Sequence, residues 1–119
     1  MQGLGGLEAE VMEVLWGAED AMSVHDLVEA LAERKQFAYT TILTVVTHLY
    51  DKGWVSRSKH GRAYYYSPVR SRAEATSLAL RELLDDSADP AAVLLHFAGT
   101  VSEDEKQALR RGLRKGRRS

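Results

Sequence analysis

The sequence predicts a mainly α-helical fold that contains one small β-hairpin. Three observations predict it. First, apolar residues recur at helical spacing in six segments. Second, those segments are separated by helix-capping residues, glycine or proline. Third, a single stretch has the character of two paired strands. The chain has 119 residues, a length that suits one compact domain or one small domain with an appendage.

The first three predicted helices precede the hairpin. The first covers about residues 7–16, and its apolar face consists of Leu7, Val11, Val14 and Leu15. The second begins after Ser23, which forms a capping box with Asp26, and its buried stripe consists of Val24, Leu27, Val28 and Leu31. The third covers about residues 40–51 and ends at Lys52-Gly53, as expected where a glycine stops a helix.

The hairpin is predicted from residues 54–58 and 63–67, which are rich in β-prone side chains. They flank Lys59-His60-Gly61-Arg62, which places a glycine in the turn, and Pro68 ends the second strand. Three helices followed by a hairpin is the element order of a winged helix-turn-helix, whose third helix enters the major groove of DNA while the hairpin, or wing, lies along the backbone. The sequence therefore predicts such a domain over residues 1–69.

Three short helices are predicted in residues 70–119. Ser71 and Glu74 form a capping box for a helix that reaches about Leu84, and Asp89-Pro90 opens the next helix. Ser102 and Glu105 form another capping box, which starts a final helix that frays into a basic tail over residues 110–119.

The helices of residues 70–119 carry apolar side chains that a small chain cannot easily bury alone. The run AAVLLHFA is apolar nearly all round, so we expect burial on more than one side. Either these helices fold back on the winged domain, or they pair with a second copy, as the two-fold symmetry of operators favours. We predict a helical dimerisation region that uses Leu80, Leu83, Leu84, Val93, Leu94, Leu95, Phe97, Leu109 and Leu113.

Charge is strongly segregated, although the net charge is only −1. Residues 1–33 carry eight acidic residues and no basic one, and residues 34–72 carry eight basic residues and one acidic one. Residues 73–105 are acidic again, and residues 106–119 contain seven basic residues and no acidic one. The basic middle segment is either solvated surface charge that happens to cluster or the footprint of a polyanionic partner such as double-stranded DNA.

The third predicted helix has two faces of different character. At 100° per residue, Ile42, Val45, Val46 and Leu49 face a core, whereas Thr40, Thr44, Thr47 and Asp51 lie opposite, flanked by Thr41, Leu43 and His48. Threonine lowers helix propensity, so four in eight residues cost stability unless they serve a purpose. A threonine can hydrogen-bond to any base and pack on a thymine methyl group. We predict base contacts by Thr40, Thr41, Leu43, Thr44, Thr47 and His48; the alternative is a surface helix without a partner.

Basic side chains flank this helix on both sides in the sequence. Arg57, Lys59 and Arg62 belong to the hairpin, and Arg34 and Lys35 precede the helix. We predict that these five residues contact phosphates, which sets the register on the duplex and makes binding sensitive to salt without reading sequence.

Other motifs point to no chemistry. Tyr64, Tyr65 and Tyr66 could stack on single-stranded nucleic acid, but tyrosines of a wing strand more often pack one face on the core and leave the other in water. The four histidines are scattered and the chain has no cysteine, so we expect no metal site and no cofactor. Nucleophile-elbow, phosphate-loop and paired-carboxylate patterns are absent, and we expect no enzyme.

The chain resembles the penicillinase-repressor family of winged-helix transcriptional repressors (BlaI/MecI/CopY type). The similarity covers about residues 4–113, and its most specific part is AYTTILTVVTHLYDKGWVSRSKHGRAYYYSPV. The resemblance implies a homodimeric repressor whose third helix reads an operator through residues that match Thr40, Thr41, Thr44, Thr47 and His48.

The resemblance also implies how repression could end. Many members are inactivated when a membrane-bound sensor protease system leads to cleavage at an Asn-Phe pair in the dimerisation helices. His96-Phe97 stands at that position, so histidine replaces the asparagine. Other members sense copper through cysteines, which this chain lacks.

Location and alternative functions complete the prediction. No stretch approaches the roughly 20 apolar residues of a membrane-spanning helix, and the start lacks a secretory signal, so we expect a cytoplasmic protein without membrane insertion. The main prediction is a repressor that occludes a promoter. A winged-helix protein-interaction module is the first alternative, and a regulator that senses a small ligand between its two halves is the second.

Overall fold

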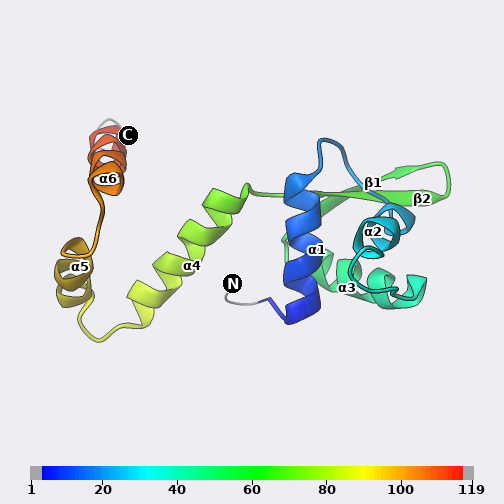
Figure 1. Cartoon of the computed structure of the whole chain (residues 1–119), viewed down its shortest axis with the longest axis horizontal. Helices are drawn as coiled ribbons and strands as arrows, with labels where there is room; N and C mark the ends of the chain where they lie inside the picture. The colour runs from blue at the N-terminus through cyan, green and yellow to red at the C-terminus, as the bar shows by residue number, and fades with distance from the viewer. Residues whose placement is uncertain (1–3, 117–119) are drawn as a thin grey trace. The chain divides into compact units, whose positions relative to one another are not determined.

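The computed structural model describes residues 4–116, and Figure 1 shows its elements in chain order. They are α1 (Gly6–Gly17), α2 (Val24–Leu31), α3 (Tyr39–Asp51), β1 (Val55–His60), β2 (Ala63–Pro68), α4 (Arg72–Asp86), α5 (Pro90–Ala98) and α6 (Glu103–Gly116). This order confirms the predicted mainly helical fold with one hairpin. Within residues 4–116, no helix is long and apolar enough to cross a membrane.

The chain forms two compact units that divide between residues 79 and 80, inside α4. The first turn of α4 is attached to α1 within the first unit. The indole Nε1 of Trp16 donates a hydrogen bond of 2.9 Å to the carbonyl oxygen of Arg70, and the Arg72 guanidinium donates one of 2.6 Å to Glu13. Ala75 is buried, so the start of α4 also packs against the first unit.

The core of the first unit joins the three helices to the hairpin, which lies beside them in Figure 1. The predicted apolar stripes of α2 and α3 are confirmed, with Val28 and Val45 partly buried. In α1, Met12 is fully buried although it lies outside the predicted apolar face, whereas Leu7 and Val14 of that face are only partly buried. The buried set is Val11, Met12, Leu15, Val24, Leu27, Leu31, Ile42, Val46, Leu49, Val55 and Tyr66.

The predicted capping boxes are present. Ser23 Oγ accepts a hydrogen bond of 3.1 Å from the Asp26 N–H, and Asp26 Oδ2 accepts one of 3.0 Å from the Ser23 N–H. Equivalent reciprocal pairs start α4 at Ser71 and Glu74 and precede α6 at Ser102 and Glu105. These pairs satisfy backbone N–H groups that the first turn of a helix leaves without partners.

The predicted fraying of the last helix is wrong as far as residue 116, because α6 continues to Gly116. Arg114 and Lys115 lie in its last turn, where positive charge stabilises the negative end of the helix dipole. The end of the predicted basic tail, residues 117–119, lies outside the described residues.

The hairpin pairs antiparallel from Val55 opposite Pro68 to His60 opposite Ala63. The loop is therefore Gly61-Arg62, two residues shorter than the predicted turn, because a two-residue loop with a left-handed residue matches the twist of paired strands. Gly61 has the required φ of +65°. At the base of the hairpin, the Met22 N–H donates a hydrogen bond of 2.9 Å to the Tyr66 carbonyl oxygen. The Tyr66 N–H donates one of 2.8 Å to the Met22 carbonyl oxygen.

Candidate nucleic-acid interface

Helix α3 turns one face to the core and the other to solvent, as its spacing predicts. Ile42, Val46 and Leu49 are fully buried. Thr40, Thr41, Leu43, Thr44 and His48 are exposed, and Thr47 is half-buried. The outward side of α3 thus brings together all six residues for which we predict base contacts.

Two threonine hydroxyls on this face are already engaged with the helix backbone. Thr44 Oγ1 donates a hydrogen bond of 2.9 Å to the Thr40 carbonyl, and Thr47 Oγ1 donates one of 2.7 Å to the Leu43 carbonyl. A hydroxyl has one hydrogen and two acceptor positions. Both side chains therefore keep only acceptor capacity for an incoming ligand, and their rotamers are fixed before it arrives.

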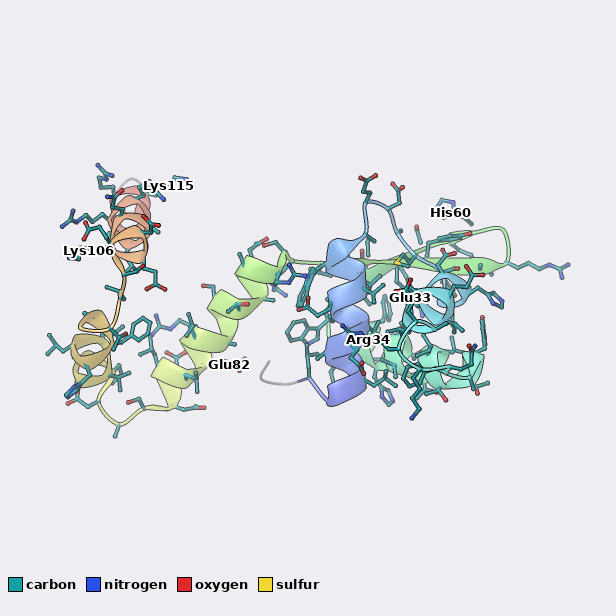
Figure 2. All side chains as sticks on the ribbon, in the orientation of Figure 1. Glu33, Arg34, His60, Glu82, Lys106 and Lys115 are labelled. Atoms are coloured by element: carbon teal, nitrogen blue, oxygen red, sulfur yellow. The ribbon has the colours of Figure 1, made fainter. Side chains whose placement is uncertain are left out.

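The wing carries exposed positive charge next to α3. Lys59 lies on β1 and Arg62 lies in the turn, and both side chains are exposed. His60 lies on the same hairpin, where Figure 2 labels it; its ring meets that of Tyr65 edge-on at 5.5 Å, and its Nε2 lies 3.2 Å from Ser58 Oγ. Lys59 and Arg62 can approach a polyanion without first losing an ion pair, since neither has an ion-pair partner among residues 4–116.

Arg57, the third basic residue of the wing, has different surroundings. Its guanidinium carbon lies 4.0 Å from the ring centre of Tyr50 on α3 and 4.3 Å from that of Tyr64 on β2. Burial lowers the pKa of Arg57, but a hydrogen bond with Tyr66 and the neighbouring phenol groups outweigh this effect and raise the pKa above its ordinary value. Tyr50 was not predicted as a functional residue, because it lies between the core face and the outward face of α3 for which the spacing gave a role.

The three consecutive tyrosines have three different environments. Tyr66 is buried in the core, as we predicted for wing tyrosines. Tyr64 lies on the same face of the strand but remains 40% exposed and contacts Arg57 instead. Tyr65 lies on the opposite face, half-buried against His60. The core interpretation therefore holds for Tyr66 and is wrong for Tyr64.

The basic residues before α3 are exposed. Arg34 makes a long ion pair of 3.6 Å with Glu10 on α1, and Lys35 Nζ lies 5.6 Å from the ring centre of Phe37. An exposed pair of this kind contributes little free energy, so Arg34 can exchange its partner for a phosphate at small cost.

Two aromatic side chains that the sequence analysis did not select meet at the helix starts. The rings of His25 on α2 and Tyr39 on α3 lie 4.7 Å apart, which links the first turns of the two helices. Across residues 4–116, no three histidine, aspartate or glutamate side chains lie close enough together to hold a metal ion.

The second unit exposes most of its large apolar side chains. No residue of α5 or α6 is buried by the chain itself, and Leu95, at 78%, is the most exposed of the large apolar residues described. Leu84 is half-buried. The other residues for which we predict dimer contacts are exposed: Leu80, Leu83, Val93, Leu94, Phe97, Leu109 and Leu113.

A helix with an outward polar face, packed beside a hairpin with exposed cations, defines a winged-helix DNA-binding protein. A model of the penicillinase repressor family matches residues 4–115. The transcriptional regulator BlaI of Mycobacterium tuberculosis is 39% identical over 113 residues, which cover 92% of this chain and 82% of that protein.

Two further comparisons match a smaller part of the chain. The methicillin resistance regulatory protein MecI of Staphylococcus aureus is 34% identical over 67 residues, 56% of this chain and 54% of MecI. The solution structure of the DNA binding domain of the repressor BlaI matches 60% of this chain and 87% of that domain, with a TM-score of 0.54 and 25% identity. The chain belongs to the penicillinase repressor family, a non-enzymatic class of DNA-binding transcriptional repressors.

Proposed function

We propose that the protein is a homodimeric repressor that occludes a promoter by binding a near-palindromic operator. The observation that carries this proposal is the threonine-rich outward face of α3 beside the exposed cations of the wing. In this proposal, residues 1–69 bind DNA and residues 70–119 hold the dimer together. The protein then acts at the nucleoid, in the cytoplasm.

The bases of each half-site are read by α3. Thr40, Thr41, Leu43, Thr44, Thr47 and His48 face the major groove in this proposal. The hydroxyl hydrogens of Thr44 and Thr47 are bonded to backbone carbonyls, so their oxygens accept from base amino groups, as adenine and cytosine present. Leu43, 38% exposed, is suited to a thymine methyl group.

Phosphates on either side of the groove are contacted by Lys59 and Arg62 of the wing and by Arg34 and Lys35 before α3. Their exposure supports this role. Such contacts supply affinity and register without sequence preference.

The dimer forms through the apolar side chains of the second unit. A single chain leaves Leu95, Phe97 and Leu113 each more than half exposed, which is a large apolar surface for a unit of this size. In this proposal a second copy of the same chain buries this apolar surface, because a two-fold dimer also matches the symmetry of an operator.

Repression ends by proteolysis at His96–Phe97, set off by a membrane-bound sensor protease system, or by another signal that separates the protomers. The bond lies in the last turn of α5, where the carbonyl oxygens of His96 and Phe97 accept hydrogen bonds from the N–H groups of Gly99 and Thr100. Both residues are exposed, so unwinding one terminal turn makes the bond accessible.

The test is footprinting of the protein on its own promoter region, with salt titrated and a random duplex as the control. We expect a protected near-palindrome with half-sites about one or two helical turns apart and a preference of at least ~10³ over random DNA. Weak, salt-sensitive binding without preference would contradict operator recognition and would favour the protein-interaction alternative.

A further inference from the structure

Burial decreases steadily along one face of β1, and Arg57 stands at the transition. Val55 is buried, Arg57 is half-buried and Lys59 is exposed, and all three point to the same face because they alternate along the strand. Of these three residues, Arg57 is the one that lies between the core and the solvent. It contacts α3 through the ring of Tyr50.

Two aromatic rings contact the Arg57 guanidinium. The ring centres of Tyr50 on α3 and Tyr64 on β2 lie 4.0 Å and 4.3 Å from its central carbon, and the buried Tyr66 lies opposite Arg57 across the hairpin. A planar guanidinium stacks well between two rings, whereas an ammonium group is a strongly hydrated point charge. Because Tyr50 belongs to α3 and Arg57 and Tyr64 belong to the hairpin, these contacts join the wing to the helix proposed to read DNA.

We propose that Arg57 is a positioning residue that fixes the wing on α3, and that it does not contact phosphate. This inference replaces the role that the sequence suggested for Arg57, and it rests on the proposed contact of the wing residue Arg62 with phosphate. Through the Tyr50–Arg57–Tyr64 stack, the register of the wing on the backbone depends on the position of α3 in the groove.

Two kinds of substitution separate positioning from direct contact. Arg57→Lys keeps the charge, so a phosphate contact would largely survive it, but the planar stack is lost. Tyr50→Leu removes one wall of the stack and alters no charge, and Tyr50→Phe keeps the ring and serves as its matched control. We expect Arg57→Lys and Tyr50→Leu to weaken operator binding by about three- to tenfold, and Tyr50→Phe to change it little.

The closing experiment is a double-mutant cycle with Arg62→Ala, read as operator affinity over a salt titration, together with amide hydrogen exchange of the wing without DNA. In the Tyr50→Leu background we expect Arg62→Ala to cost less than it does in the unmodified protein, because a displaced wing has already lost that contact. We also expect faster exchange at residues 55–68 in Arg57→Lys and Tyr50→Leu than in Tyr50→Phe.

The two measurements distinguish two failures. The positioning role of Arg57 would be overturned if the losses of operator affinity in the double-mutant cycle were additive. It would also be overturned if amide exchange of the wing were unchanged in both Arg57→Lys and Tyr50→Leu. If Arg62→Ala alone left affinity and salt dependence unchanged, the proposed phosphate contact would be wrong. The exchange data would then still decide whether Arg57 fixes the wing.

Discussion

Lys52 Nζ lies 2.9 Å and 3.0 Å from the two carboxylate oxygens of Glu8, which is 44 residues earlier in the chain. Lys52 is the C-cap of α3, and Glu8 lies in the first turn of α1, where it also accepts a hydrogen bond of 3.0 Å from the Gly5 N–H. The pair therefore ties the end of the proposed DNA-reading helix to the start of α1. The backbone hydrogen bond from Gly5 and the contact with Lys52 lower the pKa of Glu8 below 4.5.

Glu8→Gln is expected to lower the free energy of unfolding at neutral pH by about 0.5–1 kcal/mol, because glutamine can keep the cap but not the charge. Since the folded pKa of Glu8 lies below the unfolded one, its stabilisation is complete above the unfolded pKa and is lost as the pH falls through the folded pKa. Urea unfolding of both proteins from neutral to strongly acidic pH checks this. A difference that stayed constant at the acidic end would contradict the role of the charge.

Thr44→Ala and Thr47→Ala are each expected to weaken operator binding by about 1–3 kcal/mol and to relax sequence preference. Neither should lower the thermal stability, because alanine has the higher helix propensity. Thr44→Ser separates the two parts of the side chain, since it keeps the hydroxyl and removes the methyl group. Competition binding with operator variants measures the effect, and unchanged preference in both alanine variants would exclude α3 as the reader.

Arg62→Ala is expected to weaken binding to operator and random duplex alike, and to reduce the slope of log K against log salt by about one. Arg81→Ala is the matched control, because Arg81 lies on α4 and pairs with Asp85 at 3.2 Å. Fluorescence anisotropy at several salt concentrations gives both slopes. A loss confined to one base sequence would contradict a phosphate contact.

If the proposed dimer forms through the second unit, Leu95→Asp is expected to convert it to monomers, because a carboxylate within an apolar interface would be buried without a partner. Val69→Asp is the matched control, since Val69 is an exposed apolar residue of the first unit, at 50%. Sedimentation velocity reports the oligomeric state directly. A Leu95→Asp protein that still sedimented as a dimer would exclude this surface as the interface.

Cleavage at His96–Phe97 predicts an N-terminal fragment that ends at His96 in cells exposed to the inducing signal. His96→Asn restores the residue pair that the family resemblance associates with cleavage, and we expect it to increase the yield of this fragment. Mass spectrometry of the repressor before and after induction measures both results. Intact protein in fully induced cells would mean that another signal ends repression.

Local sequence rules predicted most of the secondary structure, because the responsible interactions span only a few residues. Ser23 with Asp26 and Ser102 with Glu105 act across three residues, so their effect can be read directly from the sequence. The two faces of α3 follow in the same way from a period of 3.6 residues.

Contacts between elements could not be predicted in this way. Arg57 was assigned by its charge alone, and nothing local indicates that Tyr50 lies over it once the chain turns at Gly53. Met12 was missed because the predicted face of α1 was too narrow, whereas the hairpin and both neighbouring helices enclose the helix more widely. The position of such residues depends on how the elements pack against one another, and the periodicity of a single element describes that packing only in part.

Four threonines, short and uncharged, lie on the outward side of α3, and the wing beside it carries exposed cations. Short β-branched residues lose little conformational entropy when they are ordered, so in the proposed function α3 discriminates among bases without a large entropic cost on binding. Under this proposal, overall affinity and the choice of target depend on separate segments of the chain. Substitutions on one helix face would then redirect the protein to a new operator while the phosphate contacts of the wing are retained, so the architecture can diversify easily.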